Sequence, residues 1–304
     1  MTVGKAPLRR LIDALNHNPI IRRAKNWRNG LLDRRFRSRG HAEGKKLVDT
    51  LLSRDTNGLC FTIAFNTPWV MEILIAAWRR YPTGLKLVVV DNSSDRRRRA
   101  QIELICQTHA VSYIGLPRNP EWSPNRSHGI AMNWVFYNLV RELRPGIFGF
   151  IDHDCFPFIP FNIAKRMDGA SVYGPKVPSQ TLSGAWNLWA GFCFFRFSQI
   201  ENVALDFKHR VELGLDTGGG NWPVLYRKLN AKSIAVATTG ECPHGLGDLP
   251  RVIDGAFLHV GQASYRKDFD KLTGRKDISD RVWDSYLGGI ENREPSGSDF
   301  QYSV

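Results

Sequence analysis

Residues 85–95 read LKLVVVDNSSD and indicate the fold class of this 304-residue chain. The run LKLVVV is rich in β-branched residues, which is typical of a strand buried on both faces. Asp91 ends the run, and the short polar residues after it permit a tight turn and can cap a following helix. A carboxylate at such a strand end can also accept hydrogen bonds from nucleobase N–H groups or ribose hydroxyls. The stretch therefore predicts a buried strand followed either by a nucleotide-binding turn or by a plain helix-capping turn.

Outward from this stretch, apolar runs alternate with segments of helical periodicity. We expect further strands at residues 59–65, 111–116 and 147–151, and helices at 68–80, 95–108, 127–143 and near 269–287. This alternation is typical of a parallel sheet covered by helices on both faces, so we expect an α/β, Rossmann-like fold. Ligands of such sheets bind beyond the carboxyl ends of the strands, where the sequence places Asn66, Asp91 and Asp152.

Asp152-His153-Asp154 directly follows the strand expected at residues 147–151. Two carboxylates at positions i and i+2 can converge on one Mg²⁺ or Mn²⁺ ion that also binds a diphosphate. Such an ion neutralises the charge that develops on a nucleoside diphosphate leaving group. A solvated acidic turn is the alternative, but the flanking Phe and Pro residues make an apolar setting in which unpaired carboxylates are costly. His259 could complete the metal shell if the fold brings it to the acidic pair.

Aromatic residues gather in the run WNLWAGFCFFRF (186–197), and a glycine-rich turn, LDTGGGNW (215–222), comes later. Tryptophans stack on sugar faces through the same surfaces that pack cores. Most of these aromatics suit a core, and Trp189 and Trp222 are the candidates for acceptor binding. Asp216 suits a general base for an acceptor hydroxyl, or alternatively a helix N-cap.

The order of these motifs resembles the GT-A glycosyltransferases, especially the family 2-like enzymes, over about residues 58–262. The resemblance implies that the end of the first strand and the DNSSD-like turn hold the nucleoside. It therefore places three residues in the donor site: Asn66, Asp91 and Ser93. The stretch SHGIAMN (127–133) resembles the segment that passes the nucleotide in these enzymes, so His128 and Asn133 are expected there too.

The same resemblance implies roles for the acidic residues. Asp154 matches the direct metal ligand, and Asp152 matches its partner toward ribose and metal. His259 resembles the C-terminal metal histidine of many members, and Asp216 falls where inverting members keep their catalytic base. The expected cofactor is Mn²⁺ or Mg²⁺.

The chain departs from the family pattern in three places. The acidic pair has a histidine in its middle, the turn LDTGGGNW replaces the common Glu-Asp pair, and no QxxRW motif follows. A QxxRW motif and membrane-spanning helices are expected of processive polysaccharide synthases. We therefore expect a hexosyltransferase-type enzyme that transfers a single sugar from a nucleotide-sugar donor, with inversion.

Residues 1–54 hold fourteen Lys/Arg and four Asp/Glu, a net charge of +10 out of +13 for the chain. The remainder is nearly balanced, so no nucleic-acid partner is expected. The sequence predicts a basic helical extension over residues 1–54 and a GT-A-like catalytic domain over 55–304. Within that domain we expect a nucleotide-binding half at about 55–155 and an acceptor half at about 156–304.

Asn18-Pro19 is typical of a helix start. An apolar stripe then follows at helical spacing: Ile20, Ala24, Trp27 and Leu31, with basic residues on its flanks. The stripe suits an anionic membrane surface or, alternatively, packing onto the main domain. The many like charges favour the membrane, so residues 1–40 predict a peripheral contact with its inner face and an envelope glycan or lipid-linked acceptor.

The five cysteines are widely spread without a CxxC motif, which favours a reducing cytoplasm, and no signal peptide or run of about 18 apolar residues is seen. Two other functions are compatible with parts of the sequence. A nucleotidyltransferase would normally show a glycine-rich basic loop where this chain has Phe65-Asn66-Thr67-Pro68. A non-catalytic, degenerate nucleotide-sugar-binding or membrane-recruitment protein would suit the basic segment and the run Arg96–Arg99, which otherwise indicates a solvated helix face.

Overall fold

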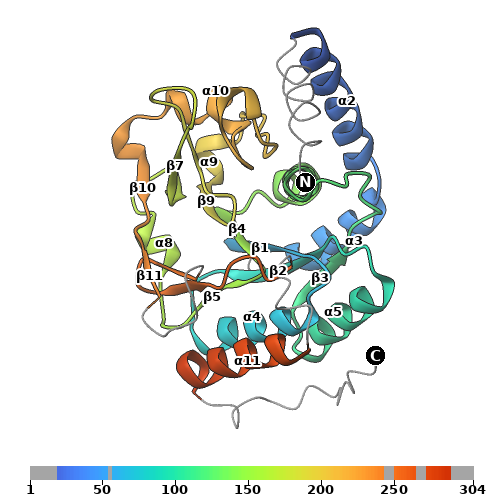
Figure 1. Ribbon diagram of the computed structural model, residues 1–304, viewed down its shortest axis with the longest axis vertical. Helices are drawn as coiled ribbons and strands as arrows, with labels where there is room; N and C mark the ends of the chain where they lie inside the picture. Colours follow the sequence, from blue (N-terminus) through green and yellow to red (C-terminus); the bar gives the residue numbers. More distant parts are fainter. Residues whose placement is uncertain (1–18, 54–56, 243–249, 265–271, 289–304) are drawn as a thin grey trace, which may run out of the picture.

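The computed structural model describes residues 19–53, 57–242, 250–264 and 272–288 (Figure 1). A seven-stranded sheet forms its centre, in the order β10-β6-β9-β4-β1-β2-β3. These strands are β1 (Gly58–Ala64), β2 (Lys86–Asp91), β3 (Ser112–Gly115), β4 (Ile147–Asp152), β6 (Val172–Gly174), β9 (Phe192–Arg196) and β10 (Ile234–Val236). The pairs β1–β2, β1–β4, β2–β3 and β6–β10 are parallel, whereas β9 runs antiparallel between β4 and β6. The predicted α/β fold with a mostly parallel sheet is therefore confirmed.

The antiparallel β9 arises from a break in the aromatic run of residues 186–197. Ala190-Gly191 separates β8 (Trp186–Leu188) from β9, and β8 pairs with β7 (Lys176–Pro178) in a hairpin-like sheet of its own. A further antiparallel sheet has the order β11-β12-β13-β5. Its strands are β11 (Thr239–Glu241), β12 (Arg251–Ile253), β13 (Phe257–His259) and β5 (Cys155–Pro157).

Helices cover both faces of the central sheet. Figure 1 shows α4 (Pro68–Arg80), α5 (Arg96–Thr108) and α11 (Leu272–Val282) together below the sheet, with α2 (Pro19–Arg37) on the other side. The long helix predicted at residues 127–143 is α6 (Pro124–Val135), continued by a π-helical turn (Phe136–Val140) and α7 (Arg141–Leu143). The remaining helical segments are α3 (His41–Leu52), α8 (Ile163–Arg166), α9 (Phe197–Ile200), α10 (Asn221–Val224), the π turn Trp283–Leu287, and 3-10 turns at Val211–Leu213, Tyr226–Lys228 and Ala231–Ser233.

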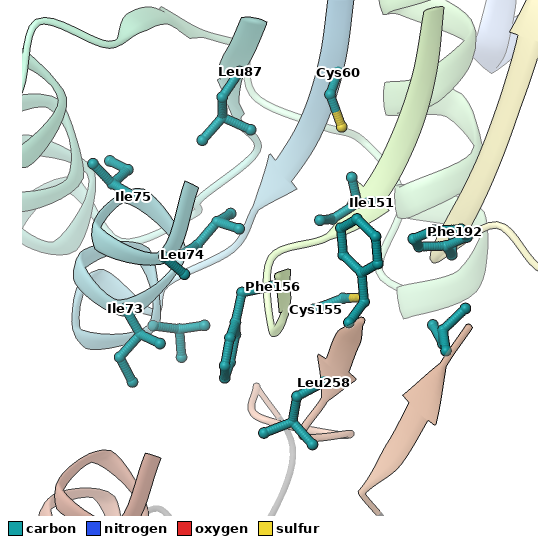
Figure 2. Close-up of a cluster of buried hydrophobic side chains, with 14 of the residues drawn as sticks. Cys60, Ile73, Leu74, Ile75, Leu87, Ile151, Cys155, Phe156, Phe192 and Leu258 are labelled. Carbon is teal, nitrogen blue, oxygen red and sulfur yellow. The ribbon is translucent and has the colours of Figure 1, made fainter. Parts of the chain in front are cut away.

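The core lies on both faces of the sheet, because alternate residues of each strand point to opposite sides. In β1, Cys60 and Ala64 join the cluster that packs on α4, α5 and α11, whereas Phe61 and Ile63 join the cluster that packs on α3 and α6. Figure 2 shows part of the first cluster, with Phe156 and Leu258 from the second sheet beneath the central strands. Burial on both faces explains why the strands appear as unbroken apolar runs.

Part of the N-terminal segment packs on this core; residues 1–18 of the predicted extension lie outside the described part. Leu47 and Leu51 of α3 are buried in the same cluster as Phe61. The described part of helix α2 spans Pro19–Arg37, and Asp33 and Phe36 on one of its faces are buried; the predicted N-cap Asn18 lies outside the described residues. Among the described helices, none combines the length and apolar character that a bilayer crossing requires.

Candidate active site

A cleft of about 930 Å³ lies at the carboxyl ends of β1, β2 and β4, the place where parallel sheets bind ligands. It brings together residues that are far apart in the sequence. Those that line it and were singled out from the sequence are Ser93, His128, Asp152, Asp154, Trp189, Asp216 and His259.

Two carboxylates and one imidazole converge on the floor of the cleft. Asp152 ends β4, Asp154 follows it, and His259 ends β13. The Nε2 atom of His259 lies 3.4 Å from an oxygen of Asp154 and 3.8 Å from an oxygen of Asp152. One ligand atom from each of the three side chains lies within 4.8 Å of the others. The arrangement follows from strand register, because β13 pairs with β5 and sets His259 opposite Cys155, the residue after Asp154.

Their mutual interactions show that the three side chains form one electrostatic unit. Burial raises the pKa of Asp152 to about 6, and the neighbouring Asp154 acts in the same direction. Burial also opposes ionisation of Asp154, but the attraction and hydrogen bond of His259 outweigh it and hold the pKa of that carboxyl below its usual range. Burial alone would lower the pKa of His259, yet the two carboxylates raise it. Two carboxylate oxygens and one imidazole nitrogen at this spacing fit a divalent cation.

The break at Ala190-Gly191 makes room for this group. The N–H of Asp152 donates to the carbonyl of Gly191 at 2.9 Å. A β-carbon at position 191 would collide with the Asp152 carboxylate and with the ring of Trp189. Trp189 in turn packs edge-on against His259, with ring centroids 4.6 Å apart. The glycine therefore lets the carboxylate and the indole share one wall of the cleft.

Asp216 lies in the glycine-rich turn that forms another part of the cleft lining. Its carboxylate accepts hydrogen bonds from the N–H of Thr217 at 2.8 Å and from the side-chain amide of Asn125 at 2.9 Å. Gly218 has φ +90°, a conformation that favours glycine, and its N–H donates to the carbonyl of Phe207 at 2.7 Å. The alternative role of Asp216 as a helix N-cap is wrong, because Gly220 occupies that position before α10.

His128 lies in the same cleft, with Nε2 3.9 Å from an oxygen of Asp152. Burial lowers its pKa to about 4, although the carboxylates of Asp216 and Asp154 pull in the opposite direction. The imidazole is therefore neutral near pH 7, with one nitrogen as a donor and the other as an acceptor.

Asp91 and Asn66 lie behind the cleft wall and do not line it. The Asp91 carboxylate is fully buried and accepts hydrogen bonds from the N–H of Ser93 at 2.8 Å and the hydroxyl of Tyr113 at 3.1 Å. Burial raises the pKa of Asp91. The backbone N–H of Asn66 donates to the Ser93 hydroxyl at 2.8 Å. The Asn66 side chain donates to the hydroxyl of Ser94 and accepts from the N–H of Asp95, so Asp91 and Asn66 both hold the turn that presents Ser93.

Asn133 and Trp222 are also outside the cleft lining. Asn133 is buried on α6, where its amide donates to the carboxylates of Asp33 (3.1 Å) and Asp206 (3.2 Å) and accepts from the N–H of Phe207. Trp222 packs against Trp186, with ring centroids 6.1 Å apart. Residue type alone could not predict that these side chains lie outside the cleft, because asparagine and tryptophan are used inside the fold as readily as in ligand sites.

Several residues that line the cleft were not identified from the sequence as site residues. They are Asn92, Arg96, Arg99, Arg118, Asn119, Trp122, Asn125, Asn187 and Gln262. The arginine run at 96–99 indicated a solvated face, yet two of its members face the cleft. Arg99 also donates to the carbonyl of Asp91 at 3.0 Å. The sequence offered one indication that Arg96 and Arg99 belong to the site, namely their position at the start of α5, directly after the DNSSD turn.

No protein-family model matches this chain, and neither does any curated protein. Solved structures similar to it include the mannosyltransferase PcManGT from Pyrobaculum calidifontis in complex with GDP-Man and Mn²⁺. That match has 11% identity and a TM-score of 0.40 and covers 68% of this chain and 66% of that chain. S. aureus TarS 1-349 is similar at 15% identity, with a TM-score of 0.37 and 55% and 53% coverage. The WbbM bifunctional glycosyltransferase is similar at 11% identity, with a TM-score of 0.35 and 49% and 33% coverage.

The chain thus spans from about a third to about two thirds of the length of these structures. Two of them carry glycosyltransferase names, the class that the sequence motifs resemble. The activity proposed for this chain rests on the residues of the cleft.

Proposed function

We propose that this chain is a metal-dependent glycosyltransferase that moves one sugar from a nucleotide-sugar donor onto an acceptor hydroxyl, with inversion. One observation carries the proposal: a carboxylate pair, an imidazole and a separate, hydrogen-bonded carboxylate share one cleft at the end of a parallel sheet. The first three groups suit a cation that binds a diphosphate, and the fourth suits a base.

Asp152, Asp154 and His259 would hold the ion. When bound, it would neutralise the charge that develops on the departing nucleoside diphosphate. The imidazole ligand favours Mn²⁺ over Mg²⁺, which prefers an all-oxygen shell. The DNSSD turn would bind the nucleoside through Ser93, with Asp91 and Asn66 supporting the turn from behind.

Asp216 would act as the base. Its carboxylate would accept the proton of the acceptor hydroxyl while that oxygen forms a bond to the anomeric carbon and the bond from this carbon to the diphosphate oxygen breaks. Asn125 and Thr217 fix the carboxylate through two hydrogen bonds, so it is oriented before the acceptor arrives. Neutral His128 would offer a hydrogen bond to the donor, and Trp189 would present its ring to the acceptor.

The first test is a thermal-shift screen of UDP-, GDP-, dTDP- and CMP-sugars with Mn²⁺, followed by hydrolysis of the stabilising donor without acceptor. A ligand that binds the native state raises the melting temperature. We expect one donor to raise it above the value with Mn²⁺ alone, and we expect its hydrolysis to stop with EDTA. If no donor stabilises the protein, the proposal fails; if one binds without any turnover, the chain is a binding protein.

The role of Asp216 has its own test. Asp216→Asn keeps the shape and the hydrogen bond to Thr217 but cannot accept the proton, so transfer should fall by about 10²–10⁴-fold while donor stabilisation persists. An unchanged kcat in this variant would remove Asp216 as the base.

We further propose that the acceptor is a lipid-linked or envelope glycan met at an anionic membrane surface, with the protein peripheral at its cytoplasmic face. The support is the orientation of α2. A surface helix usually turns its apolar stripe toward the protein core, whereas α2 turns its apolar stripe toward solvent. Its apolar stripe points away from the protein: Ile20 is 75% and Trp27 68% exposed, and Leu31 is exposed too. Asp33 and Phe36, on the opposite side of the helix, are buried. The four arginines beside the stripe, Arg23, Arg28, Arg34 and Arg35, are exposed as well.

Flotation with vesicles containing phosphatidylglycerol tests this contact. The triple variant Ile20→Ser, Trp27→Ser, Leu31→Ser should lose most of its binding, because it removes the apolar stripe and leaves every charge in place. Vesicles of phosphatidylcholine alone serve as the control for charge. Equal partitioning of wild type and variant would contradict a membrane role for α2.

A further inference from the structure

A tryptophan stands exposed at the mouth of the cleft, and neither the donor site nor the metal site uses it. Trp122 lines the cleft, and its side chain is 82% exposed, the largest value among the exposed large apolar residues of the described segments. Leaving an indole in water forgoes the apolar burial that usually stabilises a tryptophan. A rigid aromatic face held open beside a binding cleft is typical of a recognition surface.

The loop that carries Trp122 is firmly held. The neighbouring Glu121 is buried, and its carboxylate accepts a hydrogen bond from Arg126 Nε at 2.7 Å and lies 3.6 Å from Arg28 of α2. The backbone N–H of Glu121 donates to the side chain of Asn119 at 3.0 Å. The guanidinium of Arg126 also lies 5.2 Å from the centroid of the Trp122 ring. These contacts hold Glu121 and Arg126, and Arg126 lies against the indole, so the chain that carries Trp122 is ordered before any ligand binds.

The same segment leads directly to the proposed base. Asn125, three residues after Trp122, donates its amide to the Asp216 carboxylate at 2.9 Å. Trp122, Asn125 and Asp216 line the same cleft. A saccharide that lies on the indole can therefore extend along the cleft toward Asp216.

We propose that Trp122 is the platform of an acceptor subsite that binds the face of a pyranose ring. The apolar C–H face of the sugar would lie on the indole, and Arg126 would donate hydrogen bonds to ring hydroxyls. This inference rests on the proposed function and gives it a chemical class of acceptor: a saccharide whose terminal ring is held at the cleft mouth. A second use of the indole, insertion into a bilayer beside Trp27, is a separate outcome of the test.

Saturation-transfer NMR on the full chain tests the subsite without donor or metal. The probes are methyl α-glucopyranoside, methyl α-mannopyranoside, methyl β-galactopyranoside and N-acetylglucosamine. We expect at least one of them to receive saturation at its ring C–H protons from the wild type and from Trp27→Ala, the matched exposed tryptophan. Trp122→Ala should weaken this signal about fivefold or more, the loss expected for one aromatic contact, and Trp122→Phe should retain part of it.

Three results would overturn the subsite. The wild type could show no transfer to any of the four probes, or Trp122→Ala could show the same transfer as the wild type. Alternatively, Trp122→Ala could lose binding to phosphatidylglycerol vesicles while its glycoside signal is unchanged, which would assign the indole to the membrane surface. Since free glycosides need neither donor nor ion, the subsite can fail while donor hydrolysis succeeds, and sugar transfer can fail while the subsite holds.

Discussion

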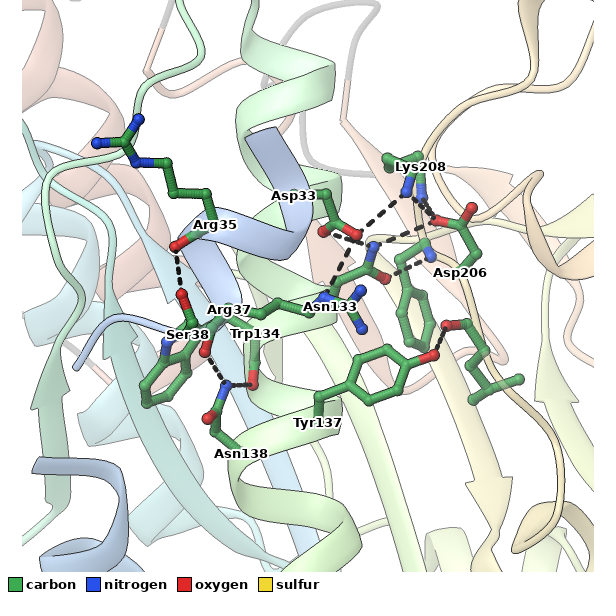
Figure 3. Close-up of polar contacts among 12 residues, drawn as sticks. Asp33, Arg35, Arg37, Ser38, Asn133, Trp134, Tyr137, Asn138, Asp206 and Lys208 are labelled. Atoms are coloured by element: carbon green, nitrogen blue, oxygen red, sulfur yellow. Dashed lines mark hydrogen bonds and ion pairs between the residues drawn. The ribbon is translucent and has the colours of Figure 1, made fainter. Parts of the chain in front are cut away.

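In the described part of this protein, two pairs of aspartates can be compared. They differ in the groups that neutralise their charges. Asp33 of α2 and Asp206 share Lys208, whose Nζ lies 3.2 Å from the first carboxylate and 3.3 Å from the second (Figure 3). The amide of Asn133 donates to both carboxylates as well. This pair has a permanent cation and a shared donor within the fold, so its charges are satisfied internally.

Among the described residues, Asp152 and Asp154 have no such cation. The titratable side chains within 4.0 Å of this pair are two histidines, neutral His128 and His259. The pair faces the cleft, and the pKa of Asp152 is raised to about 6 by burial and by Asp154. Carboxylates that converge therefore do not by themselves make a metal site. The pair with its own lysine is structural, and the pair left without one is where an external cation would be stabilised.

The largest expected effect is on the pair without a lysine. Asp154→Ala should lower Mn²⁺-dependent donor turnover by roughly 10³-fold, because an ion stabilises the leaving charge by several kcal/mol. Steady-state donor hydrolysis with and without EDTA measures this. Asp168→Ala removes an exposed carboxylate outside the cleft and should behave as wild type. Full turnover of Asp154→Ala in EDTA would contradict the proposed role of a metal ion.

Substitution of the lysine between Asp33 and Asp206 should change the stability of the fold. Lys208→Met keeps the aliphatic stem but removes the shared cation, so the fold should lose about 2–3 kcal/mol of unfolding free energy. Urea denaturation followed by circular dichroism measures the change. Adding Asp206→Asn should restore part of the loss, since one carboxylate is then neutral. A Lys208→Met protein as stable as wild type would show that the lysine does not stabilise its aspartate pair.

The smallest effect is the pH dependence of the metal-free protein. The folded pKa of Asp152 lies above the unfolded value of about 3.9, so the folded state binds more protons between about pH 4 and 6, and stability falls as pH rises through that window. Asp152→Asn removes the free-energy cost of ionising a carboxyl group at this position in the folded state. We expect the melting temperature of the metal-free variant to exceed that of wild type by about 2–4 °C above pH 6, and the two to converge near pH 4. Saturating Mn²⁺ should reverse the order. A pH-independent difference would contradict titration of Asp152 as the cause.

Much of the sheet was predictable from sequence because strands buried on both faces appear as unbroken apolar runs. The strand pairing that brings His259 to Asp154 was harder to predict from sequence. Nothing within either segment specifies that β13 pairs with β5 across a separation of about 100 residues. Asp91 and Asn133 show a second limit: a polar side chain near a strand end or on a helix can satisfy the protein's own N–H groups instead of a ligand's. The sequence left two possible partners for the apolar stripe of α2, a membrane surface and the main domain. In the structure, the polar contacts of Asp33 turn the opposite face of the helix inward.

The backbone bonds beneath Asp216 have a practical consequence for anyone who shortens this protein. Gly218 and Gly220 donate to the carbonyls of Phe207 and Lys208, and this segment is in turn held by Asn133 and by Asp33 of α2. Cutting at residue 40 would therefore remove Asp33, which supports the segment beneath Asp216, the proposed base. A fragment tested for catalysis should therefore retain Asp33, and comparisons of membrane binding should use the full chain with point substitutions.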